Sequence, residues 1–157
     1  VSWDEIILRS IRIKSEIVES DPFETGRRKV LNFGHTIGHA LESLFLEGGE
    51  ASLLHGEAVV AGMICESWMS NQLCGLKENE LEEITHTLLQ LYGPVNVDSM
   101  SDHRLIELMR HDKKNESGVI YFTLLGAIGK PFIKKKAVEE DIIEALNYYR
   151  TISRHTH

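Results

Sequence analysis

The stretch from Arg28 to Glu42 reads R-K-V-L-N-F-G-H-T-I-G-H-A-L-E and carries two histidines, His35 and His39, four residues apart. On an α-helix this spacing places both side chains on one face, with their Cβ atoms about 5–6 Å apart. A glycine precedes each histidine, and glycine in a helix interior costs about 1 kcal/mol relative to alanine. That cost indicates that a neighbouring helix or a ligand approaches the backbone closely in this stretch.

A third histidine, His55, follows in the segment L-H-G-E-A-V and again lies beside a glycine at a predicted helix start. Two neutral imidazoles and one further ligand would leave a zinc ion the open position that catalytic sites need. By spacing alone, His35 and His39 would be the paired ligands. Polar packing on a half-buried helix explains the same H-x-x-x-H pair about equally well.

The composition indicates one ordinary domain that spans residues 1–157 and is large enough for a hydrophobic core. A net charge of −7 argues against a nucleic-acid-binding protein. No apolar run approaches the roughly 18 residues of a membrane span, and no secretory signal is visible. The two cysteines form no C-x-x-C pair, so we expect a protein of the reducing cytoplasm. Because the chain begins with Val1, we expect either a fragment that lacks its N-terminal part or a processed protein.

Hydrophobic periodicity predicts a mainly α fold, a bundle-like domain of about six helices with one short β-hairpin near residues 119–133. The nearly unbroken apolar pattern from Gly56 to Asn71 places that helix at the centre of the bundle. Asn79 is a plausible N-cap, and the tail from Thr151 resembles a frayed end. The other predicted helices cover Ser2–Glu19, the His35–His39 stretch, Asn79–Leu91, Ser101–His111 and Glu139–Tyr149, and the core is expected near Ile11, Leu41, Val60, Leu88 and Leu108.

Basic residues mark a possible anion site in this acidic chain. Lys113 and Lys114 form a basic cluster, and Arg28 precedes the first histidine. Phosphate and carboxylate groups bind such donors, arginine as a planar fork and lysine as a point charge. The two lysines are equally explained as positive charges at a helix C-terminus.

Together these motifs resemble the C-terminal domain of the 3-dehydroquinate synthase family. The resemblance rests on the Arg28–Glu42 run and the Leu54–Val59 segment, and it extends from Lys14 to Gly129 in the family's order. It implies an enzyme of the shikimate pathway that converts 3-deoxy-D-arabino-heptulosonate 7-phosphate to 3-dehydroquinate and phosphate, a lyase reaction. The family implies Zn²⁺ or Co²⁺ and NAD as cofactors. The NAD-binding N-terminal domain is absent from this chain, so the isolated chain is expected to be inactive.

The resemblance also assigns roles to residues. His35 and His55 match the metal-ligand histidines, whereas His39 matches a histidine of proton transfer, which departs from the assignment by spacing. Glu24 matches a second proton acceptor. The positions that match substrate contacts are Lys14, Arg28, Asn32, His55 and one of Lys113 or Lys114. The expected partners are an anionic sugar phosphate, the chain's own N-terminal domain and a second copy in a homodimer, with no nucleic acid and no membrane.

Three alternatives fit part of the pattern. A sister sugar-phosphate cyclase has similar metal motifs, although such relatives often alter the basic residues that correspond to Lys14 and Arg28. A glycerol-dehydrogenase-like domain shares the architecture but usually lacks the Arg28–Glu57 constellation. A non-catalytic helical module that folds around zinc is the third, and it should unfold when the metal is chelated.

Overall fold

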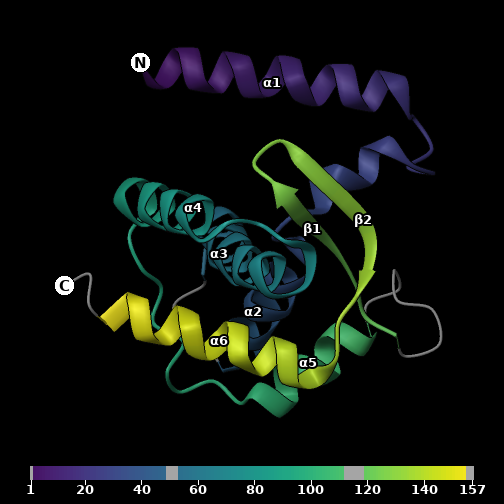
Figure 1. Ribbon diagram of the computed structural model, residues 1–157. Helices are drawn as coiled ribbons and strands as arrows, with labels where there is room; N and C mark the ends of the chain where they lie inside the picture. The colour runs from purple at the N-terminus through teal and green to yellow at the C-terminus, as the bar shows by residue number, and fades with distance from the viewer. Residues whose placement is uncertain (1, 49–52, 112–118, 155–157) are drawn as a thin grey trace.

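The computed structural model describes residues 2–48, 53–111 and 119–154, which form six α-helices, one 3-10 helix and a two-stranded sheet (Figure 1). This confirms the mainly α fold with a short hairpin. In chain order the elements are α1 (Trp3–Ser20), η1 (Arg27–Asn32), α2 (His35–Gly48), α3 (His55–Cys74), α4 (Glu78–Tyr92), α5 (Asp102–His111), β1 (Tyr121–Ala127), β2 (Lys130–Lys136) and α6 (Glu139–Arg154).

Helix α3 is the centre of the domain, as its apolar pattern predicts. It packs against α2, α4, α6 and β1, and half of its residues are buried. Leu41 of α2, Ile64 of α3 and Ile142 of α6 meet in one core with exposures of 1% or less. Complete burial of a large apolar side chain contributes about 1.5–3 kcal/mol to the free energy of folding.

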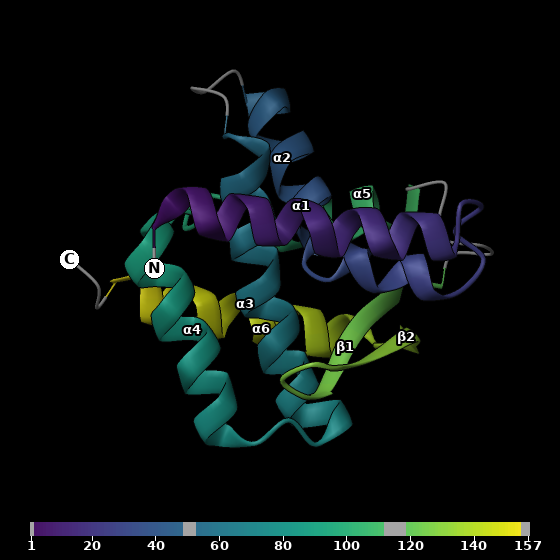
Figure 2. The same cartoon turned by 90° about the horizontal axis from the view of Figure 1, so that it is seen from above.

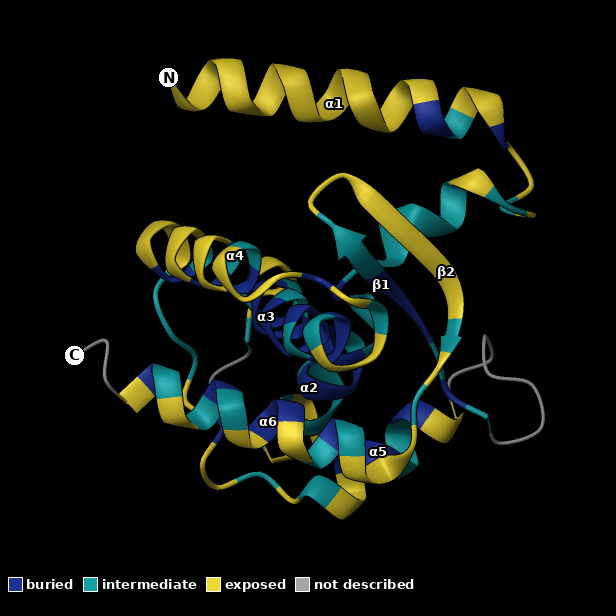
Figure 3. Cartoon of the chain, viewed as in Figure 1, coloured by how far each residue is buried: buried dark blue, intermediate teal, exposed yellow. Residues whose placement is uncertain are grey.

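The hairpin closes one side of α3. Strand β1 pairs antiparallel with β2, with Leu124 opposite Phe132. Phe122 and Leu124 of β1 are buried, while nearly all of β2 is exposed (Figure 3). Two hydrogen bonds anchor β1: the N–H of Leu125 donates to Ser70 Oγ of α3, and the Thr123 hydroxyl donates to the carbonyl of Lys29 in η1.

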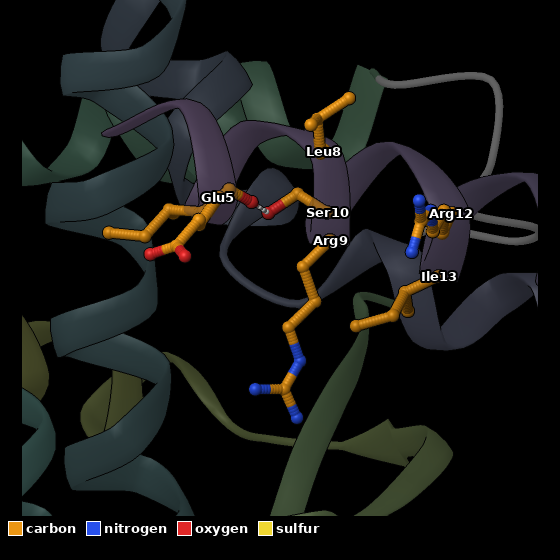
Figure 4. A pocket seen from close by; sticks show the side chains of 7 residues that line it. Glu5, Leu8, Arg9, Ser10, Arg12 and Ile13 are labelled. Carbon is orange, nitrogen blue, oxygen red and sulfur yellow. Dashed lines mark hydrogen bonds between the residues drawn. The ribbon is translucent and has the colours of Figure 1, made fainter. Parts of the chain in front are cut away.

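Helix α1 crosses the body of the domain and lies apart from it, as Figures 1 and 2 show. Its contacts within the described residues are chiefly with η1, and Ile17 is its one buried residue. Seven α1 residues line an open hollow of about 670 Å³. Figure 4 shows Leu8 pointing to the opposite side of the helix from Glu5, Arg9 and Ile13. The prediction that Ile11 belongs to the core is therefore wrong, since its side chain is 56% exposed.

Three local expectations are corrected. Gly34 does not lie in a helix interior, because η1 ends at Asn32 and Gly34 adopts φ +81° before α2 begins at His35. Asn79 lies inside α4, whose first turn follows Lys77, so it is not the N-cap. Residues 151–154 continue α6 and bury Ser153 instead of fraying. Among the described helices, none combines the length and apolarity that crossing a bilayer requires.

Candidate metal and substrate site

A close crossing of α2 and α3 builds the site, and glycines permit it. A Cβ on Gly62 would lie 2.0 Å from the carbonyl oxygen of Gly34, and one on Gly38 would lie 2.9 Å from Val59 Cα. Contacts this short exclude any side chain at these positions. The expectation that a neighbouring helix approaches the backbone here is confirmed at both glycines, since a Cβ on Gly34, in the bend before α2, would also lie 2.7 Å from the carbonyl oxygen of Val59.

The crossing brings together three histidines from two helix starts. The ring centroids lie 5.3 Å apart for His35 and His39, 5.7 Å for His35 and His55, and 5.6 Å for His39 and His55. One nitrogen from each ring can be chosen so that all three lie within 4.8 Å of one another. These are nitrogen donors of the kind that Zn²⁺ and Co²⁺ bind. The residues therefore fit a divalent metal with an open coordination position.

Two of the rings have a hydrogen-bond partner on Nδ1. His35 Nδ1 lies 3.2 Å from the carbonyl oxygen of Phe33, and His55 Nδ1 lies 3.2 Å from Glu42 Oε2. A carbonyl or carboxylate oxygen accepts here, so each Nδ1 carries the proton. In metal sites such partners fix the tautomer and the ring orientation, and the opposite nitrogen, Nε2, is the ligand.

A second cluster forms in the loop between α1 and η1. The side-chain amide of Asn32 donates to Glu24 Oε1 at 2.9 Å, and the Arg28 guanidinium donates to the carbonyl of Pro22. The Asp21 carboxylate organises this loop by accepting hydrogen bonds from the backbone N–H groups of Thr25, Gly26 and Arg28. The bonds from Arg28 and Gly26 contribute most to lowering the pKa of Asp21 to about 2.

The structure thus joins some predicted site residues and leaves others apart. The three histidines form one cluster, and Glu24 and Asn32 form another, half-buried one. Lys14 is exposed on α1, the helix that packs on η1. Lys113 and Lys114 lie outside the described residues.

Sequence reasoning missed three acidic side chains that support the site: Asp21, Glu42 and Glu66. Glu66 is fully buried on α3. Burial raises its pKa to about 8, against the opposing effect of hydrogen bonds from the N–H groups of Gly34, Ile37 and Thr36. An acidic residue within the apolar pattern of α3 was the available signal, because buried carboxylates are rare without partners.

Comparisons with known proteins identify the family of this chain. The sequence model of the family described as 3-dehydroquinate synthase C-terminal matches residues 2–115. The 3-dehydroquinate synthase of Parabacteroides distasonis is 44% identical over 148 residues, which are 94% of this chain and 41% of that protein. The enzyme of the same name from Methylacidiphilum infernorum is 42% identical over 139 residues, 87% of this chain and 38% of that protein. The chain therefore spans about two fifths of the length of these relatives.

Two solved structures share the fold. The 2-epi-5-epi-valiolone synthase from Streptomyces hygroscopicus subsp. jinggangensis 5008, with NAD⁺ and Zn²⁺ bound, has a TM-score of 0.77 at 21% identity, covering 94% of this chain and 40% of that one. A 2-deoxy-scyllo-inosose synthase complexed with carbaglucose-6-phosphate, NAD⁺ and Co²⁺ has a TM-score of 0.71 at 23% identity, covering 90% and 38%. At these identities the likeness is one of fold.

Proposed function

The chain belongs to the family of 3-dehydroquinate synthase C-terminal domains, and on this premise we propose that it is the metal- and substrate-binding part of such an enzyme. The whole enzyme would convert 3-deoxy-D-arabino-heptulosonate 7-phosphate to 3-dehydroquinate and phosphate. The observation that carries the proposal is the convergence of three histidine nitrogens within 4.8 Å at the start of two crossing helices.

His35 and His55 would hold the metal through Nε2, since each has its Nδ1 bonded to an oxygen acceptor. When bound, Zn²⁺ or Co²⁺ supplies Lewis acidity that favours a substrate alkoxide. His39 is the third ring of the cluster, and we assign it to proton transfer, for which an imidazole has a suitable pKa. Glu24 is the second proton acceptor, and Asn32 Nδ2 holds its carboxylate in place.

Arg28, Asn32 and Lys14 would bind the anionic ends of the substrate, together with one of Lys113 or Lys114. Arg28 lies on η1 beside Asn32, and α1, which carries Lys14, packs on the same element. A guanidinium forms paired hydrogen bonds with phosphate or carboxylate. These cations give an acidic protein a local attraction for a dianionic sugar phosphate.

NAD would be bound by another part of the protein. The described residues contain a two-stranded antiparallel sheet and helices, without the parallel βαβ unit that binds dinucleotides. The relatives are more than twice as long as this chain, which leaves room for such a domain. The exposed apolar side chains of α1 support a contact with that domain, and we expect a homodimer of the whole protein.

Among the sugar-phosphate cyclases, dehydroquinate formation is favoured by sequence. A relative named 3-dehydroquinate synthase reaches 44% identity, whereas the two solved structures named above, synthases of 2-deoxy-scyllo-inosose and 2-epi-5-epi-valiolone, share 23% and 21%. A structural zinc module is less consistent with a ring cluster at a helix crossing, where a buried core already holds the helices together.

A chimera tests the proposal. This chain replaces the C-terminal part of the Parabacteroides distasonis enzyme, and phosphate release is measured with the heptulosonate phosphate, NAD and Zn²⁺. We expect turnover from the chimera and none from the isolated chain, whose described residues contain no dinucleotide-binding unit to hold NAD as the hydride acceptor. His86→Ala, on the exposed face of α4, is the control and should retain turnover. A folded, NAD-binding chimera without turnover would contradict the proposal.

A further inference from the structure

Glu66 is a buried acidic side chain to which the chemistry proposed above gives no role. It lies on α3, one helical turn beyond Gly62, the residue that presses against Gly34. Its exposure is 0%. A carboxyl group in such a place is unfavourable unless it is hydrogen-bonded, so its partners identify what it does.

Those partners are backbone N–H groups on both sides of His35. Glu66 Oε2 accepts the N–H of Gly34 at 2.7 Å, and Oε1 lies 3.4 Å from the N–H of Ile37. One side chain of α3 therefore holds the bend before α2 and the first turn of α2. Because His35 lies between the two anchored amides, the direction of its Cα–Cβ bond is fixed relative to α3, the helix that begins with His55.

The N–H of Gly34 and the carbonyl of Phe33 belong to one peptide unit. The carbonyl end of that unit accepts the Nδ1 proton of His35 at 3.2 Å, while the N–H end donates to Glu66 at 2.7 Å. The two hydrogen bonds form a chain from the carboxyl group through the peptide to the imidazole. Hydrogen bonds linked in this way polarise one another, by about 10–30% per bond.

We propose that Glu66 is the positioning residue of His35, acting through the Phe33–Gly34 peptide as Glu42 acts directly on His55. Glu66 keeps the Nδ1–H tautomer of His35 and turns Nε2 toward the metal position. The role in metal binding rests on the function proposed above, whereas the effect on the His35 ring does not require a metal.

Helix α3 lies directly against this bend: a Cβ on Gly34 would be 2.7 Å from the carbonyl oxygen of Val59, and one on Gly62 would be 2.0 Å from the carbonyl oxygen of Gly34. Glu66 adds to this close contact the hydrogen bond that holds the orientation of the Phe33–Gly34 peptide. Partners of metal-ligating histidines typically contribute 10–100-fold in metal affinity. A glutamine at position 66 keeps the shape and one acceptor oxygen, but it presents an amide nitrogen, which cannot accept, to one of the two N–H groups that Glu66 holds.

The test compares Glu66→Gln with Ser67→Ala, a buried neighbour on α3 whose hydroxyl donates to the carbonyl of Met63 in the same helix. The first measurement uses the metal-free chain: nitrogen–proton NMR of the histidine rings reports the tautomer of His35, assigned with a His35→Gln variant. We expect an Nδ1–H tautomer of His35 in the wild type. In Glu66→Gln we expect the His35 signals to shift while the His86 signals stay unchanged.

The second measurement is Co²⁺ titration followed by the visible absorption of the bound ion. We expect about 10–100-fold weaker binding in Glu66→Gln and wild-type binding in Ser67→Ala.

Each outcome decides a separate point. An Nε2–H tautomer of His35 in the wild-type chain would overturn the proposal, even if Glu66→Gln did not fold. A folded Glu66→Gln variant with a lower melting temperature but unchanged His35 signals and Co²⁺ affinity would assign Glu66 a structural role alone. Failure of the wild-type chain to bind Co²⁺ would contradict the proposed metal site, and the ring tautomer would still decide the role of Glu66.

Discussion

At the scale of single residues, the three histidines present a choice that geometry leaves open. All three rings can contribute a nitrogen within 4.8 Å of the others, and a site of three histidine ligands is one way to bind zinc. We propose that His35 and His55 are the ligands and that His39 transfers protons. His35 and His55 each have an oxygen acceptor on Nδ1, the arrangement that prepares Nε2 for a metal.

Replacing His55 and His39 in turn tests this division. In the chimeric enzyme, His55→Ala should remove metal and turnover together. His39→Ala should retain stoichiometric Zn²⁺ and lower turnover by about 10²–10⁴, the usual effect of losing a general acid or base. Metal content by atomic absorption and turnover by phosphate release are the measurements. Loss of Zn²⁺ from His39→Ala would make His39 a ligand and the assignment by spacing correct.

Glu42 is the direct carboxylate partner of His55, at 3.2 Å from its Nδ1. Glu42→Gln should weaken Co²⁺ binding by about 10–100-fold, because the ring loses the carboxylate that orients it. Glu47→Gln is the matched control, since Glu47 lies on the same helix and pairs with Arg104 instead. Equal Co²⁺ affinities for the two variants would show that Glu42 does not support the site.

At the scale of elements, the crossing of α2 and α3 depends on glycine. Gly62→Ala would place a Cβ 2.0 Å from a backbone oxygen, and overpacking of this kind costs about 1–3 kcal/mol. Gly56→Ala is the control on the same helix, where an added Cβ meets nothing within 4 Å. It should change stability by no more than about 1 kcal/mol, in the stabilising direction. Urea unfolding measures both variants. Equal stabilities would mean that the helices can separate without cost.

The stability that the loop between α1 and η1 contributes should depend on pH through the Asp21 carboxyl group. Its pKa is lowered from 3.8 to about 2, so the folded state prefers the carboxylate. The stabilising contribution is fully present above pH 3.8 and is lost as the pH falls toward 2. The difference in unfolding temperature between wild type and Asp21→Asn should therefore be largest near neutral pH and shrink in acid. A difference that is constant with pH would contradict this role for the carboxylate.

The elements also show what could be predicted from sequence. Apolar periodicity located the helices of the body because burial is repeated along each of them, whereas α1 was located by an apolar face that stays largely exposed. It misplaced Ile11 because periodicity identifies an apolar face without showing what covers it. The convergence of His35 and His55, twenty residues apart in sequence, depends on how Gly38 and Gly62 let two helices approach, and no local pattern encodes that contact. Glu66 was missed for the same reason, since its partners lie 29 and 32 residues away.

At the scale of the whole molecule, the domain is a packed body with an extended α1. The body has its own core, built by α2–α6 and β1. Helix α1 contributes little to it, and its large apolar side chains remain about half exposed, including Trp3, Ile7, Leu8 and Ile11. Monomeric proteins rarely leave a contiguous apolar surface of this kind uncovered. The folding of the body and the contacts of α1 should therefore be separable by mutation.

A double variant, Ile7→Lys with Ile11→Lys, tests that separation. These side chains are 51% and 56% exposed, so the variant should change the stability of the isolated chain by no more than about 0.5 kcal/mol. Ile64→Ala, at 0% exposure, is the control for the core and should lower the stability of the isolated chain by about 2–5 kcal/mol.

In sedimentation experiments the wild-type chain should self-associate through α1 and the double variant should not. In the chimera the double variant should lose turnover, because α1 can no longer pack on the NAD-binding domain. A large loss of stability in the isolated double variant would instead place α1 in the core, and full turnover in the chimera would show that no partner domain covers this helix.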